Sequence, residues 1–128
     1  YIEDGFDEDD IDGFRLLSSF GSRIQNVGDD LFTSNIKRLE KYKDAANGLL
    51  LKINQIGTVS EAIKAAEYAQ ENGLDVTVSL RSGETSDDFI ADLAVAVGAR
   101  QIKLGSPVRE ERNAKYNRLL KIANELKR

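Results

Sequence analysis

The sequence contains no cysteine and no histidine among its 128 residues. Disulfides, thiol nucleophiles, zinc sites built from Cys and His, and Ser-His-Asp triads are therefore excluded within it. Any chemistry must be carried out by carboxylates, lysines, arginines and bound ions. Methionine is absent as well. We therefore expect a processed, trimmed or excised piece, or a numbering that starts part-way along a longer chain.

Long apolar runs are also absent, and none approaches the length of a membrane span or a signal peptide. Hydrophobic residues make up 41% of the chain and charged residues 31%, an ordinary balance for a soluble protein. We expect a cytoplasmic protein with no membrane partner. The formal net charge of −4 argues against a general attraction to nucleic acid, although the last twenty residues are basic.

Short apolar runs alternate with helical patterns at intervals of about 25 residues, without a linker or an internal domain boundary. We expect strands at residues 1–3, 24–27, 49–54, 75–80 and 100–104. We expect helices at residues 7–19, 36–42, 59–72, 89–97 and 110–127. This βα repetition predicts an α/β protein with a parallel sheet and right-handed crossovers, in one domain over residues 1–128. It leaves open whether the sheet is doubly wound or part of a barrel.

Several helix signals are specific. Thr58 and Glu61 form a capping box, and Thr85 to Asp88 resembles a second one. The strongly apolar stretch Phe89 to Val97 predicts a well-buried helix. The last helix is expected to bury one stripe of residues, namely Tyr116, Leu119, Leu120, Ala123 and Leu126.

The stretch from Gly48 to Gln55 combines an unbroken apolar run with a lysine, Lys52. Such runs are typical of strands buried on both faces of a parallel sheet. Lys52 would lie near the carboxyl end of this strand, where α/β proteins bind ligands and place catalytic side chains. The alternative is that Lys52 only extends its stem out to water.

Charged residues also follow the other expected strands. Glu3 and Asp29 are hard oxygen ligands of the kind that Mg²⁺ takes one or two at a time. They could equally be solvated acids at the starts of loops. Lys52 and Lys103 would flank a small anion, and a lysine that is crowded by a second cation and partly removed from water loses its proton more easily.

Arg81 and Ser82 lie in a glycine-containing turn before a helix, a setting that suits a phosphate group. Ordinary capping of that helix is the alternative for this turn. Taken together, the charged residues at the strand ends indicate metal-assisted proton abstraction from a small phosphorylated acid.

Six stretches of the sequence carry a resemblance to one known family. They are Ile2-Glu3-Asp4-Gly5-Phe6, Gly28-Asp29-Asp30-Leu31, the stretch from Leu49 to Thr58, the stretch from Val78 to Thr85, the stretch from Gln101 to Pro107, and Ala114-Lys115-Tyr116-Asn117-Arg118-Leu119-Leu120. In this order they resemble the motifs of the barrel domain of enolase, the glycolytic phosphopyruvate hydratase. The similarity runs essentially from end to end.

The resemblance implies parallel βα repeats that form the C-terminal half of an enolase-type TIM-like barrel, without the family's N-terminal capping domain. A complete barrel of this kind takes roughly 250 residues. The resemblance also implies Mg²⁺ as the cofactor, with Glu3 and Asp29 among its ligands.

The small-molecule partner implied by the resemblance is 2-phosphoglycerate, which enolases dehydrate to phosphoenolpyruvate. Lys52 would take its α-proton, Arg81 and Ser82 would hold its phosphate, and Lys103, next to the reacting centre, would hold its carboxylate. Lysine bases assisted by Mg²⁺ are a general feature of this superfamily.

The sequence departs from the family pattern at three positions near this site. Leu80 replaces the histidine of the Ser-His-Arg-Ser motif, and a leucine neither donates nor accepts a hydrogen bond. Leu104 and Gly5 also differ from the motif residues. The family's third carboxylate ligand and the glutamates that assist loss of hydroxide have no counterpart in these residues, so we expect weak Mg²⁺ binding and little or no dehydration by this chain alone.

Three functional hypotheses follow. The first is an enolase-type carbon–oxygen lyase, or the barrel portion of one, which forms a homo-oligomer or pairs with a missing half. The second is a non-catalytic relative that retains anion or metal binding, or a structural role. The third, a nucleic-acid binder that uses the basic last helix, is disfavoured because the chain is acidic and the helix lacks interleaved surface aromatics.

Overall fold

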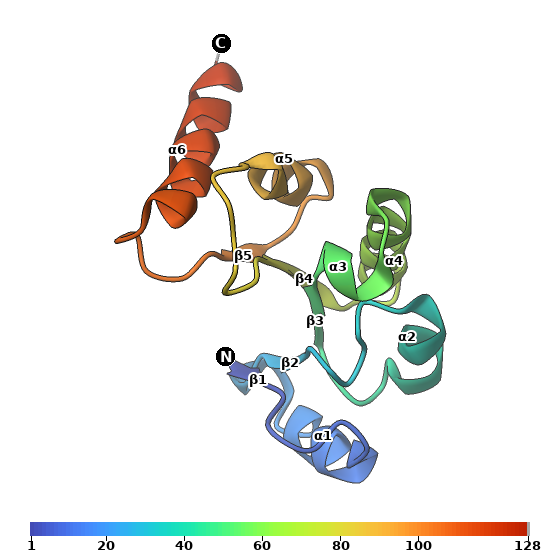
Figure 1. Ribbon diagram of the computed structural model, residues 1–128. Coiled ribbons are helices and arrows are strands. Elements are labelled where there is room, and N and C mark those ends of the chain that lie inside the picture. Colours follow the sequence, from blue (N-terminus) through green and yellow to red (C-terminus); the bar gives the residue numbers. More distant parts are fainter. Residues whose placement is uncertain (128) are drawn as a thin grey trace.

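The computed structural model describes residues 1–127, in which five strands alternate with helices along the chain (Figure 1). The strands are β1 (Ile2–Glu3), β2 (Asn26–Gly28), β3 (Gly48–Leu51), β4 (Asp75–Ser79) and β5 (Gln101–Lys103). The helices are α1 (Ile11–Ser18), the 3₁₀ turn η1 (Gly21–Arg23), α2 (Ile36–Tyr42), α3 (Ile53–Ile56), α4 (Val59–Glu71), α5 (Phe89–Ala96) and α6 (Glu110–Glu125). None of the helices in this part of the chain is long and apolar enough to cross a membrane.

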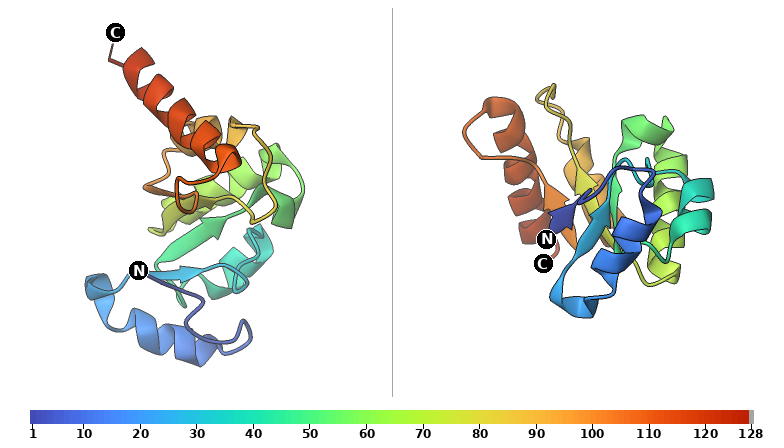
Figure 2. Two further views of the ribbon diagram at one scale, coloured as in Figure 1. Left: turned by 60° about the vertical axis from the view of Figure 1, so that its left-hand side comes forward. Right: turned by 90° about the horizontal axis from the view of Figure 1, so that it is seen from below.

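All neighbouring strands are parallel, and their order in the sheet, β1-β2-β3-β4-β5, is their order in the chain. A doubly wound sheet would reverse its strand order part-way. Here every crossover steps in the same direction, so the sheet curls, and the longer helices lie along its outer side (Figures 1 and 2). The parallel α/β sheet is therefore confirmed, and it has the form of part of a barrel.

The core lies between the sheet and the helices. Leu49 and Leu51 point into it from β3, together with Val76 and Val78 from β4. The residues between them face the other, concave side of the sheet because side chains alternate along a strand. On that side Leu50 is completely buried, whereas Thr77 and Ser79 are polar.

The strand that starts at Gly48 is shorter than expected from the sequence. It ends at Leu51, whose partner is Val78 on β4, and not at Asn54. Lys52 is the N-cap of the short helix α3, in which Ile53 and Ile56 pack against the core. A spacing of three residues is typical of a helix, so the chain turns into α3 here and the strand does not continue.

Thr58 is confirmed as the cap residue of α4, because its hydroxyl accepts a hydrogen bond from the backbone N–H of Glu61 at 3.2 Å. The side chain of Glu61 completes the pair differently from the expected box, since it accepts from the hydroxyl of Thr58 at 2.6 Å. The second box, at Thr85 to Asp88, is wrong. Helix α5 begins at Phe89, and its first N–H donates to Asp87 at 3.1 Å rather than to Thr85.

Helices α5 and α6 are less buried than their sequences suggested. Phe89 and Val95 of α5 are each 43% exposed, and Leu120 and Leu126 of α6 are 65% and 75% exposed. The far end of α6 extends beyond the rest of the molecule (Figure 2), although Ile122 within it is buried. The first helix is also shorter than expected. It starts at Ile11, and its N-cap is Asp10, whose side chain accepts from the backbone N–H of Gly13.

Candidate functional site

The residues assigned to a site from the sequence lie at one end of the sheet. Each ends a strand or follows one closely: Glu3 on β1, Asp29 after β2, Lys52 after β3, Arg81 and Ser82 after β4, and Lys103 on β5. Because all five strands are parallel, these positions share the carboxyl-terminal rim of the sheet.

Asp29 and Lys52 form an ion pair on this rim. The ammonium of Lys52 donates to Oδ2 of Asp29, and both side chains are only 11% exposed. The other carboxylate oxygen, Oδ1, accepts from Nε2 of Gln55 at 2.8 Å. Both oxygens of the Asp29 carboxylate are thus engaged, which holds the carboxylate in one orientation.

Ser34 completes a closed set of hydrogen bonds around this pair. Its buried hydroxyl accepts from the backbone N–H of Lys52 at 2.8 Å and donates to Oε1 of Gln55 at 2.8 Å. Ser34 and Thr33 both have left-handed backbones, with φ of +52° and +48°. Strain of this kind is characteristic of functional sites. Nothing in the sequence pattern singled out Ser34 or Gln55, because their partners are 18 to 26 residues away.

Glu3 and Lys103 form a second pair. Nζ of Lys103 lies 2.7 Å from Oε1 and 2.6 Å from Oε2 of Glu3. The two residues belong to β1 and β5, the edge strands of the sheet. Curling of the sheet therefore brings together side chains that are 100 positions apart in the sequence. Each predicted lysine thus faces a predicted carboxylate.

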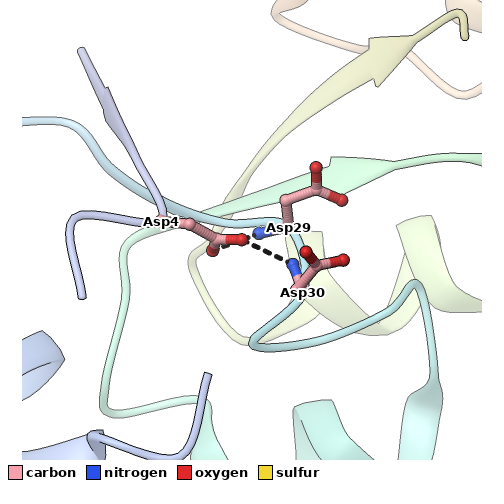
Figure 3. A group of neighbouring side chains, drawn as sticks. All are labelled: Asp4, Asp29 and Asp30. Atoms are coloured by element: carbon pink, nitrogen blue, oxygen red, sulfur yellow. Dashed lines mark hydrogen bonds between the residues drawn. The ribbon is translucent and has the colours of Figure 1, made fainter. Parts of the chain in front are cut away.

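Three aspartates, Asp4, Asp29 and Asp30, place one oxygen each within 4.8 Å of one another (Figure 3). The carboxylate of Asp4, however, accepts the backbone N–H groups of Asp29 at 2.8 Å and Asp30 at 2.7 Å. Burial raises the pKa of Asp4 above its ordinary value, although these two N–H groups act in the opposite direction. Asp4 therefore fixes the turn that carries Asp29, a role that the sequence analysis did not assign to it.

Carboxylate oxygens are the kind of ligand that Mg²⁺ takes, and Asp29 belongs to the group of three aspartates. Glu3, the other ligand expected from the sequence, is not a member of that group, and its carboxylate is paired with Lys103. A cation bound to Asp29 would have to replace the ammonium of Lys52 on one oxygen. At Glu3 it would compete with Lys103 in the same way.

Arg81 and Ser82 are exposed in the segment between β4 and α5. The backbone N–H of Arg81 donates to Oε1 of Glu84 at 3.0 Å, which closes a tight turn. Leu80, just before them, is half-buried, and its N–H donates to the carbonyl of Lys103 at 3.2 Å. Leu104 is completely packed, with 1% of its surface exposed. Neither leucine side chain can form a hydrogen bond at the rim.

The family model described as the enolase C-terminal TIM barrel domain matches residues 1–128. The enolases of Thermococcus gammatolerans, Methanopyrus kandleri and Methanocaldococcus jannaschii are 58%, 55% and 56% identical to the chain over 128, 128 and 127 residues. Each alignment covers 98% of this chain, and the chain spans 30% of the length of each relative. The family match along the whole sequence agrees with the curled parallel sheet, and the chain belongs to the enolase family.

Proposed function

We propose that these residues supply the proton-abstracting lysine and the phosphate loop of an enolase, which dehydrates 2-phosphoglycerate to phosphoenolpyruvate in glycolysis. The main support is the arrangement at the carboxyl-terminal rim, where Lys52 is held between Asp29 and the hydroxyl of Ser34. A lysine that is 11% exposed and fixed at its backbone is well placed to act as a base, since its orientation is set before a substrate arrives.

The proposed roles of the remaining residues follow from the resemblance to enolases. Arg81 and Ser82 would bind the phosphate, and Lys103 would bind the substrate carboxylate. Glu3 and Asp29 would hold Mg²⁺, which when bound supplies positive charge where negative charge develops during proton removal. Lys52 would take the α-proton on Nζ only as the neutral amine. Its ammonium would therefore first have to leave Asp29 and give a proton to water. A cytoplasmic location goes with this proposal.

A second candidate is a non-catalytic member of the family that binds anions or metal or has a structural role. It is favoured by Leu80 and by the present pairing of both lysines with carboxylates. In that case Glu3–Lys103 and Asp29–Lys52 are structural ion pairs that join neighbouring parts of the rim.

A coupled assay of phosphoenolpyruvate formation distinguishes the two candidates. We expect the 128-residue chain alone to show activity near background, even with saturating Mg²⁺. Losing one preorganised group typically costs about a hundred- to a thousandfold in rate, and general acid help contributes a similar factor. Leu80→His should not rescue activity, because the family's other assisting groups would still be missing.

The same assay on the natural protein that carries these residues tests the role of Lys52. We expect turnover that Lys52→Ala abolishes and that an exposed-lysine control, Lys64→Ala, leaves intact. A natural protein without turnover, in which Lys52→Ala changes only stability, would support the non-catalytic candidate. Robust turnover by the isolated chain, lost in Lys52→Ala, would contradict the expectation that the chain alone is inactive.

A further inference from the structure

Lys115 is a buried cation that the proposed mechanism does not use. It lies on α6, and its side chain is 0% exposed. Its ammonium donates to the carbonyls of Thr85 and Asp87 at 2.7 Å each and to that of Glu111 at 2.8 Å. It also lies 3.1 Å from Oε2 of Glu84. Lysine is almost never fully buried unless it is paired, so this position has a specific cause.

The groups that surround Lys115 come mainly from one segment, residues 80–88 between β4 and α5. Thr85, Asp87 and Glu84 all belong to it. The second oxygen of the Glu84 carboxylate, Oε1, accepts from the backbone N–H of Arg81 at 3.0 Å. One carboxylate therefore joins the buried ammonium to the backbone of Arg81.

A role in packing alone does not explain this arrangement well. An apolar side chain of similar volume usually stabilises a protein as well as a buried ion pair does, because a buried charge loses its hydration. Unlike an apolar side chain, the ammonium makes directional hydrogen bonds. It holds two carbonyls and one carboxylate of the same short segment. In the part of the chain that the structure describes, the side chains of Arg81 and Ser82 make no hydrogen bond, so they are available to a ligand.

We propose that Lys115 and Glu84 are positioning residues for an anion-binding loop, which they hold in the conformation that allows Arg81 and Ser82 to receive a phosphate group. The inference rests on the proposed function, in which this loop binds the substrate phosphate. Lys115 does not contact the ligand. It acts through Glu84 and the loop carbonyls, from the helix behind the loop.

The test measures binding of inorganic phosphate by calorimetry in the natural protein that carries these residues. Lys115→Met keeps the length and apolar volume of the side chain but removes the ammonium. We expect phosphate binding to weaken by about ten- to a hundredfold, the range found when a residue that orients a metal ligand is removed. The affinity for Mg²⁺ alone should not change, and the exposed-lysine control on the same helix, Lys121→Met, should leave both affinities intact.

A double-substitution cycle separates positioning from a general loss of stability. In an Arg81→Ala background, Lys115→Met should weaken phosphate binding further by much less than it does in the unaltered protein, because both changes remove the same interaction. Fully independent effects of the two substitutions would contradict the proposal. If Lys115→Met does not fold, Glu84→Gln decides, since it keeps an acceptor for the N–H of Arg81 and removes only the charge. Unchanged phosphate affinity in Glu84→Gln would then overturn the inference.

Failure of the proposed function gives a different result. If Arg81→Ala leaves phosphate binding unchanged, this loop is not the phosphate site and the proposed function is wrong in that respect. If Arg81→Ala weakens binding but Lys115→Met folds and binds normally, only the positioning role is wrong.

Discussion

Asp29 directs its two carboxylate oxygens to different residues, Lys52 and Gln55, and is itself nearly buried. The amide of Gln55 is neutral, so its hydrogen bond fixes the Asp29 carboxylate and leaves the negative charge unneutralised. In the proposed function, Mg²⁺ would replace the ammonium of Lys52 on the other oxygen. Ser34 ties Gln55 to the backbone of Lys52. At the scale of single residues, the rim therefore holds the proposed base and one proposed metal ligand in a fixed mutual arrangement.

Gln55→Leu removes the amide and leaves Oδ1 of Asp29 and the hydroxyl of Ser34 without this partner. A buried polar group without a partner costs about 1–3 kcal/mol, so we expect the free energy of unfolding in urea to fall by an amount in this range. The matched control is Asn54→Leu at the exposed neighbouring position, which should change it by less than about 0.5 kcal/mol. Equal effects at the two positions would show that the hydrogen bonds around Asp29 add little to stability.

Magnesium binding by the isolated chain should be weak. Glu3 and Asp29 provide two carboxylates, each already paired with a lysine, and Mg²⁺ retains most of its water unless substrate oxygens complete its shell. We expect calorimetry to give a dissociation constant in the millimolar range or above. Binding should disappear in the double variant Glu3→Gln with Asp29→Asn, whereas a cation that still binds this variant would be held elsewhere on the chain.

Helices α5 and α6 meet through a partly buried ion pair. Arg118 of α6 donates through Nε to Oδ2 of Asp92 on α5 at 2.8 Å. The hydrogen bond from Arg118 is the main reason that the pKa of Asp92 lies below its ordinary value. At the scale of elements, this contact and the buried Lys115 join α6 to the end of β4 and the start of α5.

The lowered pKa of Asp92 predicts a defined pH dependence. A carboxyl whose pKa is lower in the folded than in the unfolded state stabilises the fold above its unfolded pKa, near 3.8, and this stabilisation is lost as pH falls through the folded value. We expect Asp92→Asn to lower stability at neutral pH and to flatten the fall in stability below about pH 4, measured by urea unfolding over a pH series. Glu67→Gln on α4 is the control, because Glu67 is exposed and forms no salt bridge with any residue that the structure describes. Parallel curves for Asp92→Asn and the unaltered chain would contradict the assignment.

At the scale of the whole molecule, the curled sheet has two edge strands, β1 and β5, and the side chains of Glu3 and Lys103 form an ion pair between them. The concave inner face of the sheet is mixed, because Thr77 and Ser79 face inward from β4 and Leu50 is completely buried there. Exposed apolar surface lies instead on the helices, for example at Leu120 and Leu126.

We expect the isolated chain to self-associate, since it combines unpaired sheet edges with exposed leucines on α6. Two curled sheets that face one another would be one such arrangement. Sedimentation equilibrium at tens of micromolar is the measurement, and Leu120→Lys with Leu126→Lys should weaken association without loss of helix content. A well-behaved monomer at these concentrations would refute this expectation.

The sequence by itself determined the order of strands and helices, because apolar spacing and caps such as Thr58 act over a few residues. It also determined which charged residues lie on the rim, since parallel strands end at the same side of a sheet. Two of the predictions are wrong because neighbouring residues offer competing local patterns. At Lys52 a helical turn replaces the expected end of the strand. At the start of α5 the backbone N–H of Phe89 donates to Asp87 instead of Thr85.

Only the tertiary structure decided which of these residues meet. The pairing of Glu3 with Lys103 depends on the curl of the whole sheet, which no local pattern encodes. The role of Gln55 depends on a turn 26 residues earlier, and the burial of Lys115 depends on how α6 packs behind the β4–α5 segment. Lys115 looks like one more surface lysine in the sequence, because its charge is matched by carbonyls and a carboxylate that become neighbours only in the folded chain.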